Sequence, residues 1–435
     1  ARYEYDVPTS SFGGLIYHPR ILGSRIQASL NVNVIQYRKT GNIEGSSGKF
    51  SFGQPLYSAR TEWAWGTALA WVNRMQRQLL PDDSGRYVPR MYRDRSVSWP
   101  DDSIPYDQHA IPYEYHSRQL AWRTYVTRSF GTRRKLNLSV GLEARQNQAD
   151  AQGLVRQGYD PALVRSFEEK LLTRKNARIG PFLSLSTATL DYVSMFDLET
   201  LGLQEDVQVG PQLYAKVYTG SKRAMGTRDI VGVITGLQYT FGTGNALMRL
   251  WASHATEVSP RHEESDGLFQ GGVRAVSPRL AGLGRFVYDG GGLYHYQNAL
   301  NSRYLLGGDS RLRGYPSKLF QGQHLVTSNL EFRTRSVKIL EVLFGLTAFY
   351  DVGDAFDTGH LRPKQSVGLG GRATFPQFQR SVARLDLAFP LSKSDPDRGE
   401  RYSPVVLWLT LEGQAFPFPS LESENTETPL LPEGS

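Results

Sequence analysis

The residues of this sequence best suited to specific chemistry lie in a polar stretch at 307–316, which reads GGDSRLRGYP. Its Arg313 stands between two glycine clusters, and a guanidinium held in place can form fork-like, charge-assisted contacts with carboxylates. The stretch is too polar and too rich in glycine for a strand, so the sequence predicts a long loop over 299–322. A loop of this kind, inside a chain otherwise built from strands, indicates a segment that folds back into the protein.

The run GDS at 308–310 is superficially similar to the Gly-Asp-Ser nucleophile motif of an esterase or lipase. A serine nucleophile needs a strand–turn–helix setting and a positioned base, whereas Ser310 follows Asp309 in a pattern typical of turns. The chain has no cysteine, so it offers no thiol nucleophile and no zinc–thiolate site. Paired metal-ligand spacing is also missing from the histidines of the expected strands, His116, His254 and His295. The sequence therefore predicts no enzyme, no catalytic residue, no metal site and no cofactor.

The composition indicates the class of protein that carries this loop. The 435 residues include 43 Gly, 23 Tyr, 20 Phe and 7 Trp, at a mean hydropathy of −0.41. No apolar run is long enough for a transmembrane helix, but this combination is typical of a transmembrane barrel, in which half of every strand faces water. The formal charge of +8 comes from scattered basic residues without an aromatic-flanked basic motif, so nucleic acid is not an expected partner.

Alternation of apolar and polar residues predicts the strands of the barrel. Between Ile26 and Val34, for example, apolar residues alternate with Gln, Ser and Asn. About sixteen such segments occur, an even number as single-chain bacterial barrels have, provided that 178–199 is one long strand. Connections on one side are short and those on the other are long, as in outer-membrane barrels. The strands are expected near 25–38, 47–57, 60–75, 113–129, 133–146, 178–199, 206–219, 228–241, 244–257, 265–278, 284–298, 323–335, 338–351, 366–376, 380–391 and 403–416.

The predicted fold is thus all-β: a transmembrane antiparallel β-barrel over 25–416, with the loop 299–322 folded into its lumen. Residues 1–24 have prolines, glycines and only short apolar pieces, and we interpret them as a periplasmic segment that leads into the barrel. The chain opens at Ala1 without a charged-then-apolar leader, so a signal peptide was removed or was never present. Residues 417–435 contain four glutamates and no basic residue, which predicts an acidic, flexible tail.

Several motifs in the same order resemble the outer-membrane insertase superfamily, which includes BamA- and TamA-type assembly factors and the transporters of two-partner secretion. In that family the sixth surface loop of a sixteen-stranded barrel carries a Val/Ile/Leu-Arg-Gly-Phe/Tyr motif that is tucked into the lumen. The resemblance covers most of residues 18–416. The motifs that carry it are LRGYP (312–316), SNLEFR (328–333), FYDVGDAF (349–356), RLDLAFPL (384–391) and, near the front, HPRILGSR and SFGQPLYSARTEWAWG.

The resemblance implies that the loop motif enters the lumen; its residues are Leu312, Arg313, Gly314 and Tyr315. Residue alternation supports two partners in the barrel wall, because Glu331 and Asp351 each share a face with polar neighbours and are expected to point inward. Arg313 would then bind both carboxylates as a latch, and glycine at 314 would let the backbone approach the wall closely. The alternative is that Arg313, like most arginines of surface loops, is solvated.

The resemblance also implies a lateral seam between the first strand, 25–38, and the last strand, 403–416. Unfolded outer-membrane protein clients would pair there with an exposed strand edge. The residues expected at the seam are Ser29 and Asn31 on the first strand, with Leu407 and Leu409 on the last. The expected function is insertion and assembly of proteins in the bacterial outer membrane; an organelle outer membrane fits less well. Export of one partner polypeptide through the lumen and a passive porin stay open as alternatives.

The expected partners are membrane lipids and lipopolysaccharide, the client proteins, and periplasmic or lipoprotein accessory subunits. Two features depart from the family pattern. Family members usually carry periplasmic POTRA domains, which bind substrate proteins, before the barrel, and residues 1–24 cannot hold one. The part that recognises substrate proteins is therefore either missing from this chain or supplied by a partner. Family chains also commonly stop at an aromatic residue of the last strand, whereas Phe416 is followed by 19 residues and misses the outward register of Leu407 and Leu409 by one position.

Overall fold

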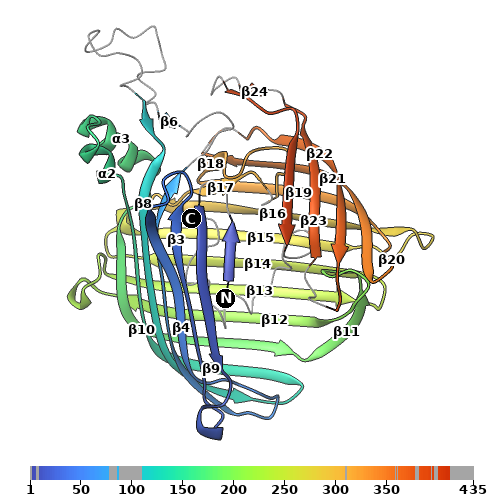
Figure 1. Ribbon diagram of the computed structural model, residues 1–435. Coiled ribbons are helices and arrows are strands. Elements are labelled where there is room, and N and C mark those ends of the chain that lie inside the picture. Colours follow the sequence, from blue (N-terminus) through green and yellow to red (C-terminus); the bar gives the residue numbers. More distant parts are fainter. Residues whose placement is uncertain are drawn as a thin grey trace.

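The computed structural model describes residues 2–5, 9–77, 86–87, 110–308, 311–357, 359, 361–377, 382–392, 394–395 and 400–411. These residues form mainly β-structure, and most strands belong to one antiparallel sheet of 20 strands that curves around an interior (Figure 1). The all-β prediction is confirmed. Between the edge strands of this sheet, β1 and β26, the described residues form no hydrogen-bonded ladder, so the sheet is not closed there.

The sheet consists of β1 (Arg2–Tyr5), β2 (Thr9–His18), β3 (Gln27–Tyr37), β4 (Ile43–Gln54), β5 (Trp63–Arg77), β8 (Glu114–Phe130), β9 (Arg134–Asp150), β10 (Asn176–Thr189), β11 (Asp191–Phe196), β12 (Gln204–Gly220), β13 (Ile230–Gly242), β14 (Leu247–Val258), β15 (Asp266–Val276), β16 (Gly284–Asn298), β19 (His324–Thr334), β20 (Val337–Ile339), β21 (Val342–Phe356), β22 (Lys364–Thr374), β23 (Val382–Pro390) and β26 (Val406–Leu411). Three short pairs stand apart from it: β6 (Arg86–Tyr87) with β7 (Ile111–Pro112), β17 (Tyr304–Leu306) with β18 (Phe320–Gly322), and β24 (Ser394–Asp395) with β25 (Glu400–Arg401). Among the described residues, the helices are α2 (Gln152–Arg156) and α3 (Pro161–Leu171), with 3-10 turns at Ile21–Gly23, Lys222–Ala224 and His262–Glu264.

Each predicted strand position overlaps a strand of the sheet, but the N-terminal segment differs from the prediction. Residues 9–18, interpreted from the sequence as part of a segment outside the barrel, form β2, which pairs with β3 from Thr9↔Tyr37 to His18↔Ala28. β1 pairs in turn with β2. The count of sixteen is therefore too low. The alternation of apolar and polar residues did not reveal β2, because three consecutive residues, Leu15 to Tyr17, are all exposed and show no alternation.

The predicted long strand 178–199 is interrupted at Leu190 and consists of β10 and β11, which pair with successive parts of β12. The tail beyond residue 411, which includes Phe416 and the predicted acidic segment, lies outside the described residues, as do Asp309 and Ser310.

The two faces of the sheet have opposite character. In β19, Leu330 is 41% exposed, whereas its neighbour Glu331 is 2% exposed on the other face. The same alternation runs through β9, β12, β21 and β23, with leucine, valine and tyrosine exposed and charged or amide side chains buried. A water-soluble sheet would bury its apolar side chains, so this inversion is typical of a wall with lipid outside and polar groups inside. We refer to the inner side as the polar face.

A small apolar core lies outside the sheet, at the end where the connections are long (Figure 1). α3 begins at Pro161, and the Asp160 side chain caps it by accepting a hydrogen bond from the Ala162 N–H at 2.8 Å. In the part of the chain that is described, no helix is long and apolar enough to cross a membrane. The core consists of Tyr87, Ile111, Ala151, Leu154, Leu163, Val164, Phe167 and Leu172.

Candidate functional site: the long loop on the polar face

The connection between β16 and β19, residues 299–323, is the long loop that the sequence predicted. Near its base β17 pairs with β18, so the loop forms a hairpin of its own. Beyond this pair the chain turns at Gly307 and Gly308, whose φ angles of 126° and 79° are accessible mainly to glycine. A Cβ at Gly307 would lie 2.4 Å from the Pro316 carbonyl oxygen. These glycines let the loop fold back tightly on itself.

Apolar side chains anchor the loop close to its tip. Leu312 and Tyr315 are fully buried. The Tyr315 ring lies 5.2 Å from Phe320 and 5.1 Å from Tyr402, in edge-to-face geometry. Its hydroxyl donates a hydrogen bond to the Gln365 carbonyl at 3.0 Å. The apolar cluster around the motif also includes Leu306, Leu319 and Ala355.

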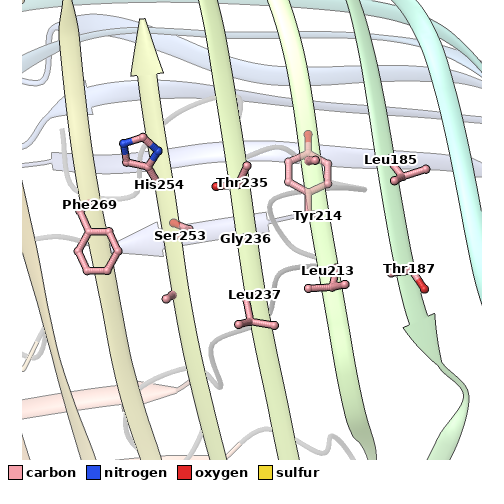
Figure 2. Close-up of a pocket in the computed structure, with 12 residues that line it drawn as sticks. Leu185, Thr187, Leu213, Tyr214, Thr235, Gly236, Leu237, Ser253, His254 and Phe269 are labelled. Atoms are coloured by element: carbon pink, nitrogen blue, oxygen red, sulfur yellow. The ribbon is translucent and has the colours of Figure 1, made fainter.

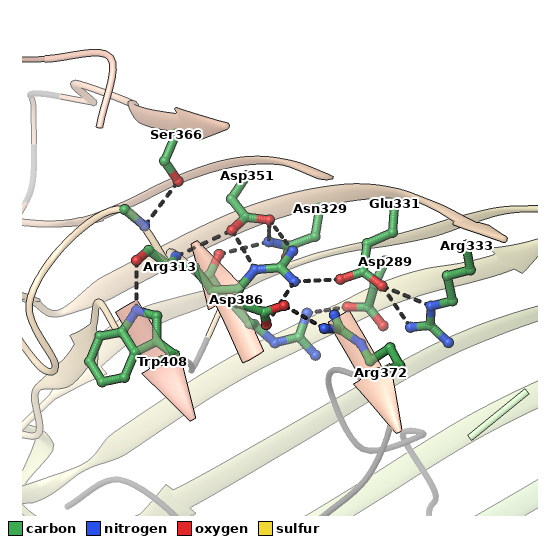
Figure 3. Close-up of polar contacts among 12 residues, drawn as sticks. Asp289, Arg313, Asn329, Glu331, Arg333, Asp351, Ser366, Arg372, Asp386 and Trp408 are labelled. Atoms are coloured by element: carbon green, nitrogen blue, oxygen red, sulfur yellow. Dashed lines mark hydrogen bonds and ion pairs between the residues drawn. The ribbon is translucent and has the colours of Figure 1, made fainter. Parts of the chain in front are cut away.

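Arg313 is completely buried and binds two carboxylates of the sheet (Figure 3). Its Nε and Nη2 donate to the two oxygens of Asp351 at 2.8 and 2.7 Å, and its Nη1 donates to Glu331 at 2.6 Å. The guanidinium also lies 3.5 Å from the centre of the Phe349 ring. Burial by itself lowers the pKa of Arg313, but the carboxylates of Asp351 and Glu331 outweigh it and raise the pKa above its ordinary value. The side chain is thus a charged fork held in a site without solvent.

The contacts of Arg313 belong to a larger network of buried charges. Asp386 lies 3.7 Å from Arg313 Nη1 and also pairs with Arg372. The second oxygen of Glu331 accepts a hydrogen bond from Arg333 Nε at 2.8 Å and forms an ion pair with Arg333 Nη2, also at 2.8 Å. Because a buried ion pair that loses one partner leaves the other charge uncompensated, we estimate that removing the guanidinium costs about 3–5 kcal/mol.

The loop backbone is also attached to the sheet. The Asn329 amide donates to the Arg311 carbonyl at 2.7 Å and to Asp351 at 2.9 Å. Beside the arginine, the Gly314 N–H donates to the Ser366 hydroxyl at 3.2 Å, and a Cβ at 314 would lie 2.3 Å from the Ser366 Cβ. Glycine is therefore required at this position for steric reasons.

The last strand of the sheet contacts the loop directly. The indole N–H of Trp408 on β26 donates to the Arg313 carbonyl at 2.7 Å (Figure 3). This contact joins the tip of the loop to the strand at one edge of the sheet. Sequence analysis missed Trp408, together with Asp386, Arg333 and Arg372. Alternation in RLDLAFPL and SNLEFR places Asp386 and Arg333 on the polar face, but it does not show which charges meet there.

The predicted seam residues do not come together in this structure. Ser29 and Asn31 lie on β3, which pairs with β2 on one side and β4 on the other; Ser29, for example, is opposite both Tyr17 and Ser51. They are therefore not at a sheet edge, because the unpredicted β2 occupies that place. Leu407 and Leu409 are exposed on β26, which within the described residues pairs with β23 alone.

The base of the long loop is held by the end of α3 and the segment that follows it. The Asn301 amide donates to the Leu172 carbonyl at 2.9 Å, and Arg303 Nε donates to the Lys170 carbonyl at 3.1 Å. The Arg174 N–H donates to the Leu300 carbonyl at 2.7 Å. Charges thus hold the tip of the loop, whereas mainly backbone acceptors hold its base.

A cavity of about 440 Å³ lies elsewhere, over β10 to β15 (Figure 2). Its lining is mainly apolar and includes side chains of the exposed face, such as Leu185, Leu213, Leu237 and Phe269. The one imidazole there, His254, is stacked on Tyr296 and hydrogen-bonded to its hydroxyl at 2.8 Å. The cavity is separate from the loop and suits apolar contacts only.

Comparison with known proteins places the loop within a family domain. Residues 284–405 match the Omp85 superfamily domain. The match includes the loop motif, Glu331, Asp351 and Asp386, and it confirms the superfamily that the sequence motifs resemble.

Similar solved structures share little sequence with this chain. CdiB from Acinetobacter baumannii is 13% identical at a TM-score of 0.46, and the match covers 92% of this chain and 55% of that one. BamA from Haemophilus ducreyi lacking POTRA domains 1-3 is 10% identical at a TM-score of 0.43, and the match covers 93% of this chain and 69% of the BamA chain. The ferric enterobactin receptor PfeA from Pseudomonas aeruginosa is 10% identical at a TM-score of 0.40, and the match covers 90% of this chain and 66% of the PfeA chain. The chain thus spans about half the length of the CdiB chain, and no curated protein matches it.

Proposed function

We propose that this protein is a β-barrel of the bacterial outer membrane that assists the insertion of other outer-membrane proteins. The long loop 299–323 lies in the barrel lumen, and Arg313 is the latch that holds it there. The observation that carries this proposal is the complete burial of Arg313 between Asp351 and Glu331, inside an Omp85 domain. The apolar exposed face of the sheet supports the membrane setting.

The lateral seam lies at the edges of the sheet, between β26 and the β1–β2 pair, and β3 is not part of it. An unfolded client would add its strand to such an edge by β-augmentation, which supplies the missing main-chain hydrogen bonds. Trp408 supports this role for β26, because its bond to the Arg313 carbonyl connects the edge strand with the loop. Lipids, lipopolysaccharide and accessory subunits are the further partners of this proposal.

The second candidate function is export of one partner polypeptide through the lumen. The observation in its favour is the polar face itself, where buried amide and hydroxyl side chains such as Gln212, Gln238 and Ser184 extend well away from the long loop. A path lined by such groups suits an extended polypeptide or, in a passive porin, small solutes.

Site-specific photocrosslinking in native outer membranes tests these functions. One probe replaces Leu409 on β26, a second replaces Ser184 on the polar face of β10, and a control probe replaces Leu250 on the exposed face of β14. Crosslinks from 409 to several barrel precursors, absent from 250, are the expected result. Crosslinks from 184 to a single exported polypeptide would establish export instead. If neither probe captured a polypeptide, both functions would be wrong.

A further inference from the structure

The connection between β11 and β12 folds onto the same polar face as the long loop. β11 pairs with the first part of β12, from Asp191↔Val209 to Phe196↔Gln204. β13 joins β12 only from Gly210 onward, so the hairpin 191–209 projects beyond its neighbour. Figure 1 shows β11 and the start of β12 curving away from the line of the wall. The hairpin lies at the end of the sheet opposite the long connections.

The hairpin is packed against the sheet by apolar side chains. Met195 and Leu198 are almost completely buried, and Val207 joins them. Their partners are Leu247, Val276 and Val287, which lie at the ends of β14, β15 and β16. These three belong to the polar face, since they alternate in their strands with exposed Met248, half-buried Ala275 and exposed Phe286. An apolar patch within an otherwise polar face thus receives the hairpin.

Hydrogen bonds fix the conformation of the turn at 197–203. The Glu205 carboxylate accepts the backbone N–H groups of Leu198, Glu199 and Thr200 at 2.9 to 3.1 Å. Asp197 accepts hydrogen bonds from the Arg279 guanidinium at 2.6 Å and the Ser336 hydroxyl at 3.0 Å. The turn is therefore attached to two further places, the connections between β15 and β16 and between β19 and β20, and its polar groups are largely satisfied inside the protein.

One arginine joins this turn to the long loop. Arg333 Nη1 donates to the Leu198 carbonyl at 2.8 Å, and its Nε donates to Glu331, with which its Nη2 also forms an ion pair. The other oxygen of Glu331 binds Arg313 at 2.6 Å. A continuous path of hydrogen bonds thus runs from the Leu198 carbonyl through Arg333 and Glu331 to the loop arginine.

We propose that the hairpin 191–209 is a second plug, which closes the end of the barrel opposite the long loop. Arg333 is the positioning residue that couples the two, because the carboxylate that it holds is also a partner of Arg313. An unfolded client or exported chain that displaces either plug then weakens the contacts of the other. The proposal rests on the enclosed lumen of the proposed function, and it does not depend on which client the barrel handles.

Single-channel conductance of the purified full chain in planar bilayers tests the plug. The protein has no native cysteine, so the pair Leu201→Cys and Gly345→Cys can tether the turn to β21, where a Cβ at 345 would lie 3.1 Å from Leu201 Cδ2. The control pair, Ser29→Cys and Ser51→Cys, links β3 to β4 at hydroxyls 2.7 Å apart. Oxidation is expected to reduce open events at least fivefold in the first pair, reversibly with reductant, and to leave the control unchanged.

A second variant keeps the test decisive if the disulfide fails to form. Leu198→Asp places a charge in the apolar patch, and a several-fold rise in conductance is expected because the hairpin detaches. Equal conductance in the unmodified protein, the tethered pair and Leu198→Asp would overturn the plug. Because conductance requires no client, failure of client insertion would affect the proposed function and leave this result intact.

The coupling through Arg333 has its own readout, the maleimide labelling rate of a cysteine introduced at the buried loop position 319 by Leu319→Cys. Leu198→Asp is expected to raise this rate at least fivefold when Arg333 is present. In an Arg333→Gln background, the same substitution is expected to change the rate less than twofold. Equal increases in both backgrounds would show that Arg333 does not couple the plugs.

Discussion

The long loop 299–323 and the hairpin 191–209 approach the same polar face from opposite ends of the sheet, but different forces hold them. Apolar packing contributes to both, but the loop tip depends in addition on one buried guanidinium between fixed carboxylates, a contact that works only at one distance and orientation. The hairpin depends on apolar packing of Met195, Leu198 and Val207, which tolerates small shifts. The loop is therefore expected to detach as a unit, and the hairpin to loosen gradually.

The largest effect is expected from Arg313→Ala. The substitution leaves Glu331, Asp351 and Asp386 facing one another without the cation, and we estimate a loss of about 3–5 kcal/mol in loop docking. Client insertion in proteoliposomes is expected to fall more than tenfold, while heat-modifiable migration in gels shows a folded barrel. Arg313→Lys is the matched control, since it keeps the charge without the fork and should give an intermediate loss. Full activity of Arg313→Ala, with unchanged protease sensitivity of the loop, would refute the latch.

The corresponding substitution in the hairpin is Met195→Ala, which removes a completely buried side chain. We expect a local loss of about 2–4 kcal/mol from the cavity that it creates. Hydrogen exchange of the amides at 195–207 should accelerate accordingly. Met195→Leu nearly conserves the volume and is expected to cost less than about 1.5 kcal/mol. If both substitutions had the same effect, apolar packing would not be the force that holds the hairpin.

Gly314→Ala examines how closely the loop backbone must approach the sheet. The new methyl group would collide with Ser366, whose Cβ lies 2.3 Å away, and overpacking of this kind costs about 1–3 kcal/mol. Faster proteolysis of the loop is the expected result. The double variant Gly314→Ala with Ser366→Gly removes the collision and should restore most of the protection; no restoration would mean that another contact limits the approach.

The smallest effect is expected at the base of the loop. Asn301→Ala removes amide hydrogen bonds to the Leu172 and Glu169 carbonyls near the protein surface, worth about 0.5–1.5 kcal/mol. Hydrogen exchange at 299–303 should increase, while protection at 312–315 stays unchanged. An equal increase at both places would indicate that the base and the tip of the loop move together.

Most of the sequence prediction came from the alternation of apolar and polar residues, because the two faces of this sheet differ so clearly. It located Glu331 and Asp351 on the polar face, and in the structure both carboxylates accept hydrogen bonds from Arg313. It missed β2, where Gly13, Gly14 and the exposed run that follows interrupt the period. It also read 191–196 as the continuation of a straight strand. Periodicity reports which way a side chain points within its strand, but it does not report where a hairpin bends or which buried charges meet.

The contacts of the long loop have a consequence for the order in which the chain folds. The sheet residues described above that bind Arg313 or Gly314 follow the loop in sequence, from Glu331 to Trp408, and the most distant of these contacts spans 95 residues. Short separations close at a low entropic cost and are expected to form early. The part of the chain from the long loop 299–323 to β26 is therefore expected to fold first, and the earlier strands are then added to it.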